Sequence, residues 1–181
     1  MLEKMERHDF DKVFGIMEDS FPIDEFRTYG EQKALLDHPC YQIYVARGQE
    51  GEGIKAFLTI WEFEEIIFIE HFAVEPSRRG SGMGSRMLGE LSELPAALGK
   101  RICLEVEPPQ DELTSRRVGF YERNGFFLNK CSYMQPAISK GKRSIPLFIM
   151  TSGGQIDEKE FNKIKTLLYT EVYGVLEKKG R

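Results

Sequence analysis

A glycine-rich segment that directly follows an apolar strand carries the clearest chemical signal in this sequence. The order is His71-Phe-Ala-Val74, a turn with Pro76, and the loop Arg79-Gly-Ser-Gly-Met-Gly-Ser85, which leads into an amphipathic helix. Glycines let the backbone approach a ligand closely, and the first N–H groups of a helix lie at the positive end of its dipole. The segment therefore predicts a loop that binds phosphate groups.

Three kinds of glycine loop compete for this segment, and their spacing separates them. A dinucleotide-binding turn requires G-x-G-x-x-G, in which Gly80 and Gly82 fit but Ser85 occupies the third position. A P-loop requires lysine and then serine or threonine after its last glycine, whereas Gly84 is followed by serine and arginine. The pattern that remains is Arg79-x-x-Gly82-x-Gly84.

This remaining pattern, with Ala73-Val74 before it, resembles the coenzyme A diphosphate loop of the GNAT superfamily of N-acetyltransferases. A second motif follows in the order that the family has. A strand ending in Leu104-Glu-Val106 is followed by a helix ending in Phe120-Tyr-x-x-x-Gly-Phe126. On these two motifs the chain is identified as a member of this superfamily over about residues 1–150.

The resemblance implies that the cofactor is acetyl-CoA and indicates which residues bind it. The expected diphosphate cradle is the backbone of Arg79, Gly80, Ser81, Gly82, Met83, Gly84 and Ser85. Backbone groups of Phe72, Ala73 and Val74 are expected to hold the pantetheine amide and to donate to the thioester oxygen. The family usually has asparagine seven residues before the motif tyrosine, where this chain has Thr114, whose hydroxyl is expected to bind the pantetheine arm.

Acetyl transfer to an amine requires a base, because an amine with a pKa of about 10 is mostly protonated at neutral pH. Glu70 and Glu105 both lie in predicted strands and compete for this role, and water or another residue is a third possibility. By resemblance, Tyr121 is the acid that protonates the coenzyme A sulfur, although it could instead be a core aromatic beside Phe120. No cysteine nucleophile lies beside a base in sequence, so we expect direct attack in a ternary complex.

The function expected from these residues is transfer of an acetyl group from acetyl-CoA to a primary amine. The alternative is a non-catalytic acyl-CoA-binding sensor or scaffold module. The segments 21–39 and 133–146 carry aromatic residues and mixed charges. The acidic residues Asp24, Glu25 and Glu31 favour a small cationic amine over a basic protein tail, but they do not identify it. Acetyl transfer is also not distinguished from transfer of a longer acyl group.

Composition excludes several other classes of function. The net charge of −4 provides no strong field for binding nucleic acid or anionic lipid. The three cysteines and three histidines show no metal-ligand spacing, so neither a metal site nor a disulfide framework is expected. No apolar run approaches the roughly 18 residues of a membrane span, and a cytoplasmic protein is expected.

The pattern of elements predicts an α/β fold with one domain. We expect a mixed, mostly antiparallel twisted sheet flanked by helices, as in the GNAT fold, over residues 1–150. Residues 151–181 are expected to add a C-terminal helix that packs on the same domain or makes an oligomer contact, in a monomer or a homodimer. The expected helices are 9–20, 25–36, 83–94, 113–124 and one beginning at 157; the expected strands are 41–47, 54–61, 65–74, 101–107, 126–128 and 145–150.

Overall fold

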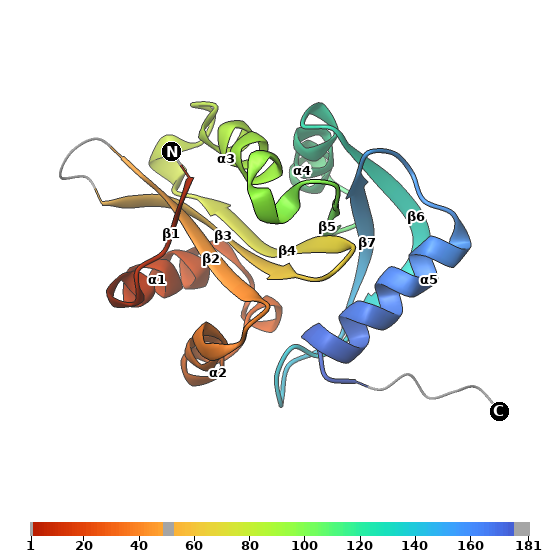
Figure 1. Cartoon of the computed structure of the whole chain (residues 1–181), viewed down its shortest axis with the longest axis horizontal. Coiled ribbons are helices and arrows are strands. Elements are labelled where there is room, and N and C mark those ends of the chain that lie inside the picture. The colour runs from red at the N-terminus through yellow and green to blue at the C-terminus, as the bar shows by residue number, and fades with distance from the viewer. Residues whose placement is uncertain (1, 49–52, 176–181) are drawn as a thin grey trace. The chain divides into compact units, whose positions relative to one another are not determined.

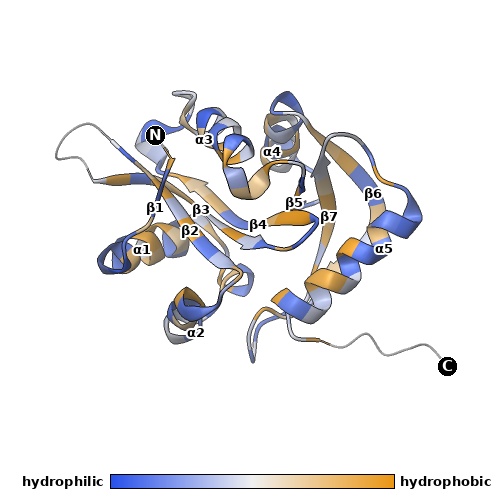
Figure 2. Cartoon of the chain, viewed as in Figure 1, coloured by the Kyte–Doolittle hydropathy of each residue, from blue (hydrophilic) through white to orange (hydrophobic). Residues whose placement is uncertain are grey.

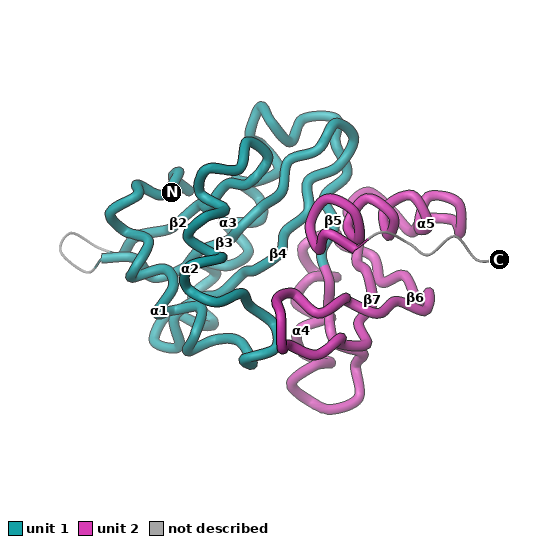
Figure 3. Tube along the Cα trace, turned by 90° about the horizontal axis from the view of Figure 1, so that it is seen from below, with its two compact units in different colours: residues 1–104 teal, residues 105–181 magenta. Residues whose placement is uncertain are grey.

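The computed structural model describes residues 2–48 and 53–175. The chain divides into two compact units, residues 1–104 and 105–181 (Figure 3). This division lies within the segment for which a single GNAT-like domain is predicted. The boundary predicted near residue 150, between that domain and a C-terminal extension, stays a prediction.

The first unit is built on five strands in the order β1-β2-β3-β4-β5 (Figure 1). The first three neighbouring pairs are antiparallel, and β4 pairs with β5 in parallel. The mixed, mostly antiparallel sheet predicted from the sequence is therefore confirmed, and the short edge strand β1 is an addition to the prediction. The bounds are β1 Leu2–Lys4, β2 Tyr41–Arg47, β3 Ile54–Glu62, β4 Ile66–Val74 and β5 Arg101–Val106.

Helices cover both faces of this sheet. In Figure 1, α1 (Phe10–Ser20) and α2 (Tyr29–Ala34) lie on one face and α3 (Met83–Glu93) on the other. The helix predicted over 25–36 is shorter than expected. It begins only after Thr28, which forms a reciprocal capping box with Glu31 and so fixes the helix start.

Burial along the strands locates the core of the first unit. Almost every residue of β3 is buried, as is the first half of β4 from Ile66 to Ile69, because both faces of the sheet are covered there. From Glu70 to Val74, β4 instead alternates between partly exposed and buried residues. In Figure 2 the helices carry both hydrophobic and hydrophilic stretches, as expected for elements with one buried side. The more open half of β4 leads directly into the glycine loop.

The second unit contains α4 (Glu112–Arg123), the antiparallel pair β6 (Phe126–Gln135) and β7 (Ile145–Ser152), and α5 (Glu158–Leu167). Strand β6 extends beyond the predicted 126–128. An irregularity between Asn129 and Tyr133 interrupts its alternating pattern, and the prediction therefore covered only the first part of the strand. The side chain of Asp157 accepts a hydrogen bond from the Glu160 N–H and so caps α5, and a π-helical turn over Leu168–Val172 follows this helix. Across the described residues, no helix combines the length and the apolar character that a membrane span requires.

Candidate functional site

The loop between β4 and α3 has the backbone geometry that its glycines predict. A short 3₁₀ turn over Pro76–Arg78 follows β4, and then Gly80 and Gly82 adopt φ angles of +77° and +81°. These angles lie in the left-handed region, where other residues are strained. Gly82 is the N-cap of α3, and no side chain caps this helix end. The N–H groups of the first turn of α3 are therefore available to an anion.

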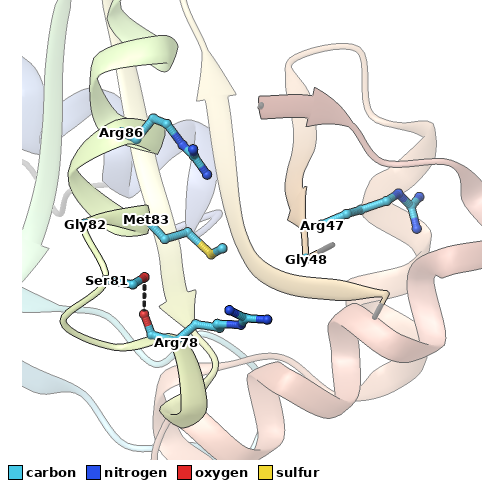
Figure 4. Close-up of a pocket in the computed structure, with 7 residues that line it drawn as sticks. All are labelled: Arg47, Gly48, Arg78, Ser81, Gly82, Met83 and Arg86. Atoms are coloured by element: carbon cyan, nitrogen blue, oxygen red, sulfur yellow. Dashed lines mark hydrogen bonds between the residues drawn. The ribbon is translucent and has the colours of Figure 1, made fainter. Parts of the chain in front are cut away.

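A pocket of about 520 Å³ opens beside this loop. In Figure 4, Arg78 and Arg86 extend from the loop and from α3 into the pocket, and Arg47 of β2 lies opposite them. The Ser81 hydroxyl donates a hydrogen bond of 2.6 Å to the Arg78 carbonyl and so tightens the turn. Arg78, Arg86 and a helix N-terminus make this pocket basic, whereas the guanidinium of Arg47 is paired with the carboxylates of Glu3 and Asp9. Its lining residues are Arg47, Gly48, Arg78, Ser81, Gly82, Met83 and Arg86.

The pocket includes only some of the residues predicted to bind the cofactor. Ser81, Gly82 and Met83 line it, whereas Arg79 turns back and donates from Nε to the Val74 carbonyl at 3.1 Å. Arg79 thus ties the loop to the end of β4 through its side chain. Arg86 was missed by the sequence reasoning, although its position one helical turn after Gly82 was a usable signal. Arg47 is far away in the sequence, and no local pattern marks it.

Glu70 lies at a β-bulge in the middle of β4. His71 pairs with Thr59, and Ile69 pairs with the next residue of β3, so Glu70 is the extra residue of the pair. The parallel pairing of β4 with β5 ends at Ile69, while β4 itself continues to Val74. The bulge therefore marks the point at which the sheet changes from a packed core to the more open half of β4.

The carboxylate of Glu70 is buried beside two basic side chains. Arg27 Nη1 lies 2.6 Å from Glu70 Oε1, and His71 Nδ1 lies 3.6 Å from Oε2. Regular strand alternation would place His71 on the face opposite Glu70, but the bulge brings both side chains together. His71 is buried, and its Nε2 lies 2.8 Å from the Glu25 carbonyl. Burial lowers the pKa of His71 below its ordinary value.

Glu105, the second candidate base, lies in the second unit between two tyrosines. Its Oε1 accepts a short hydrogen bond from the Tyr133 hydroxyl, and its Oε2 accepts one of 2.7 Å from the Tyr173 hydroxyl. Tyr133 comes from β6, and Tyr173 directly follows the π-helical turn. Both carboxylate oxygens are therefore engaged by donors within the protein. The C-terminal helical segment supplies one of these donors, which the sequence did not predict.

Tyr121 lies on the buried side of α4. Its ring meets those of Phe120 and Phe126 edge-on, at centroid distances of 5.2 Å and 5.8 Å. Burial raises the pKa of Tyr121 to about 12. Among residues 2–48 and 53–175, none hydrogen-bonds to its hydroxyl, and the two aromatic contacts hold the ring.

Thr114 has a structural role at the start of α4. Its hydroxyl accepts hydrogen bonds of 3.1 Å from the backbone N–H groups of Gln110 and Asp111, and it lies 2.9 Å from the Asp111 carboxylate. The Asp111 carboxylate in turn accepts from the Thr114 backbone, which completes a capping box. One hydroxyl has one donor and two acceptor positions, and these bonds use all of them. The role of Thr114 in cofactor binding stays a prediction.

The described residues contain no group of three or more His, Cys, Asp or Glu side chains that could hold a metal ion. The first unit thus holds a basic pocket of about 520 Å³ at the glycine loop and a buried carboxylate on β4, and the second unit holds a buried tyrosine on α4.

Comparison with known proteins agrees with the fold. Residues 39–127 match the model of the acetyltransferase (GNAT) domain. A solved GNAT-family structure from Bacteroides thetaiotaomicron, named as an acetyltransferase, has 32% identity and a TM-score of 0.82, and the match covers 97% of this chain and 99% of the other. The chain therefore belongs to the GNAT family.

Two further relatives are more partial or more distant. YjbC of Bacillus subtilis (strain 168), classed by its name among acetyltransferases, is 33% identical over 108 residues. That match covers 59% of this chain and 52% of YjbC, so it spans about half of that relative. An aminoglycoside 6′-N-acetyltransferase complexed with coenzyme A has a TM-score of 0.61 and 16% identity over 87% of this chain and 99% of the other. This last likeness concerns the fold alone.

Proposed function

We propose that this protein transfers an acetyl group from acetyl-CoA to the primary amine of a small-molecule acceptor, in preference to a protein acceptor. The observation that carries the proposal is the basic pocket at the glycine loop, in a chain that belongs to the GNAT family. Its size, its arginines and the uncapped helix end suit a diphosphate. The odd number of widely spaced cysteines supports a cytoplasmic location for the protein. The proposed reaction is compatible with a monomer or a homodimer.

The loop and β4 would hold the donor. Backbone N–H groups over residues 79–85 would bind the diphosphate, with Arg78 and Arg86 contributing charge. Backbone groups of Phe72–Val74, on the part of β4 beyond its last pair with β5, would hold the pantetheine amide. When bound, acetyl-CoA supplies an acetyl group already activated as a thioester.

We assign the role of base to Glu70 in preference to Glu105. Glu105 already accepts hydrogen bonds at both oxygens, whereas Oε2 of Glu70 is buried and accepts none from the described residues. Glu70 would take a proton from the ammonium form of the acceptor, and the neutral nitrogen would then form the bond to the acetyl carbon as the carbon–sulfur bond breaks. The first proton passes from Glu70 to solvent. The nitrogen loses a second proton to solvent as the amide forms, which balances the proton that the departing sulfur takes up.

Tyr121 would act on the departing sulfur. Its pKa of about 12 keeps the hydroxyl protonated at neutral pH, so the hydroxyl can donate a hydrogen bond to the developing thiolate. A thiol has a pKa of about 8.5, which is lower, so complete proton transfer from the tyrosine is unfavourable. The proton that ends on sulfur therefore comes from solvent, and Tyr121 keeps its own proton.

The test begins with binding and then measures transfer. Coenzyme A binding is established by calorimetry, and thiol release from acetyl-CoA is then followed with a panel of polyamines, amino sugars and amino acids. Amine-dependent thiol release supports the enzyme. Tight coenzyme A binding with no release for any amine would instead favour the non-catalytic sensor or scaffold.

A further inference from the structure

The pairing of Arg27 with Glu70 is unusual in its degree of burial. The two side chains are 8% and 2% exposed, and Arg27 Nη1 lies 2.6 Å from Oε1. Removing both charges from water costs several kcal/mol per ion, and an apolar pair of similar volume is often as stable or more stable. Stability alone therefore does not explain why these two residues are present.

The two oxygens of Glu70 differ in their surroundings. Oε1 is engaged by Arg27, whereas Oε2 is buried and accepts no hydrogen bond from any described residue. The ring of His71 is a neighbour of Oε2, but its Nδ1 lies 3.6 Å away, beyond hydrogen-bonding distance. A buried carboxylate oxygen without a donor is costly, so it points to a group that arrives there during function.

Arg27 is itself held in place by an aromatic ring. Its guanidinium carbon lies 5.9 Å from the centre of the Trp61 ring, within the range of a cation–π contact. Trp61 belongs to β3 and is 2% exposed, so it is a rigid support. Trp61 therefore fixes Arg27, and Arg27 in turn fixes one oxygen of Glu70.

We propose that Arg27 is a positioning residue that orients the carboxylate of Glu70, so that Oε2 is the oxygen that takes the proton of the acceptor amine. This inference rests on the proposed function. The β-bulge sets the direction in which the Glu70 side chain leaves β4, and Arg27 restrains its remaining rotation. Arginine suits this role because its planar, rigid guanidinium can stack on Trp61 while it donates to Oε1, which the flexible ammonium of lysine cannot do equally well.

A double-mutant cycle tests this proposal through kcat for the best acceptor amine. Glu70→Gln is expected to lower kcat by about 100-fold or more, as for loss of a base. Arg27→Gln is expected to lower kcat by about 10- to 100-fold, as for a misplaced catalytic group. If Arg27 acts through Glu70, adding Arg27→Gln to Glu70→Gln changes kcat by no more than about twofold.

Arg27→Lys provides a second variant in case Arg27→Gln folds poorly. It keeps the charge beside Glu70, so we expect a folded protein with lowered kcat, nearly unchanged KM and normal coenzyme A affinity. The matched control is Arg7→Gln, which removes an arginine that pairs with Asp37 at 2.8 Å on the exposed surface. This control should leave kcat unchanged.

The outcomes separate the two levels of the proposal. If the wild-type protein releases thiol but the effects of Arg27→Gln and Glu70→Gln on kcat multiply, Arg27 does not act through Glu70, and the positioning role is wrong while the proposed function stands. Full activity of Arg27→Lys and Arg27→Gln would overturn the positioning role as well. If the wild-type protein releases no thiol with any amine, both proposals fall together.

Discussion

The hydroxyl of Tyr173 donates a hydrogen bond of 2.7 Å to Oε2 of Glu105, although 68 positions separate the two residues in the chain. This bond connects the end of the C-terminal helical segment to strand β5 within the second unit. Because a short bond from Tyr133 engages the other oxygen, Glu105 is a structural anchor in this arrangement. Its surroundings contrast with those of Glu70, whose Oε2 accepts no hydrogen bond from the described residues.

Tyr173→Phe is expected to lower the free energy of unfolding by about 1.5 to 3 kcal/mol, because it removes a hydrogen bond to a charged group. The matched control is Tyr169→Phe, which removes a hydrogen bond to the neutral Met134 carbonyl and should cost only about 1 kcal/mol. Urea denaturation measures both. Equal losses of unfolding free energy in the two variants would show that the bond to Glu105 stabilises the protein no more than a bond to a neutral carbonyl does.

Gly82→Ala is expected to weaken coenzyme A binding and to destabilise the protein by about 1 to 2 kcal/mol, because φ at this position is +81°. Within the part of the chain that the structure describes, no atom beyond the adjacent residues lies within 4 Å of the added Cβ, so the effect would come from backbone strain and not from a clash. Gly89→Ala in α3 is the control, because Gly89 has equally open surroundings and no positive φ. It should stabilise the protein by about 0.5 to 1 kcal/mol. Similar behaviour of the two alanines would contradict the proposed geometry of the loop.

Arg86→Gln and Arg78→Gln are each expected to raise the Kd for coenzyme A by about tenfold, because each removes a charged donor from the pocket. The loss should shrink as ionic strength rises, since salt screens exposed charges. Calorimetry at low and high salt measures it. Arg116→Gln, in an exposed pair with Glu112, should change neither the affinity nor its salt dependence. A pocket that does not bind the diphosphate would leave all three variants alike.

Stability is expected to fall in mild acid because His71 is buried in its neutral form. Its pKa is lowered mainly by burial, with the Arg27 charge adding to this, against the opposing effects of Glu70 and of the Glu25 carbonyl. A group with a lowered pKa in the folded state contributes stability that is present above its unfolded value, 6.5, and is lost as the pH falls through the folded pKa. The slope reaches at most about 1.4 kcal/mol per pH unit.

Unfolding free energy measured against pH tests this expectation for wild type, His71→Gln and His8→Gln. His71→Gln should flatten the decline below pH 6.5, whereas His8→Gln should not, because the His8 side chain is 72% exposed. An unchanged slope in His71→Gln would mean that another group causes the acid sensitivity.

Tyr121→Phe is expected to lower kcat by about 10- to 100-fold, the worth of one hydrogen bond to a charged atom. Its coenzyme A affinity should be retained, and its free energy of unfolding should change by less than about 1 kcal/mol, because no described residue loses a partner. Single-turnover rates and urea denaturation check both. A kcat equal to that of wild type would remove Tyr121 from the proposed chemistry.

Local patterns in the sequence were sufficient for most of the fold. Tyr41–Arg47 has the predicted bounds, and the sheet type and the glycine loop follow from alternation and turn residues. The short helix after Thr28 was mispredicted because the apolar spacing over 25–36 outweighed the cap signal. The predicted length of strand β6 was too short, because the irregularity in the strand hides the alternation of buried and exposed residues.

The site was less accessible to sequence reasoning, because its decisive features depend on tertiary contacts. Arg27 and Glu70 lie 43 residues apart, and no spacing rule pairs them. The bulge at Glu70 breaks the strand alternation, so the side on which His71 lies cannot be taken from the sequence pattern. Likewise, the engagement of Glu105 by Tyr173 requires the C-terminal segment to fold back onto β5, which a local pattern does not encode.

The most direct measurement is the joint detection of acetylated amine and free coenzyme A by mass spectrometry after the protein is incubated with acetyl-CoA and the amine panel. We expect at least one amine to gain an acetyl group, in amounts equal to the coenzyme A released, with no acetylated protein when the amine is omitted. Coenzyme A binding without any acetylated amine would contradict the acetyltransferase assignment.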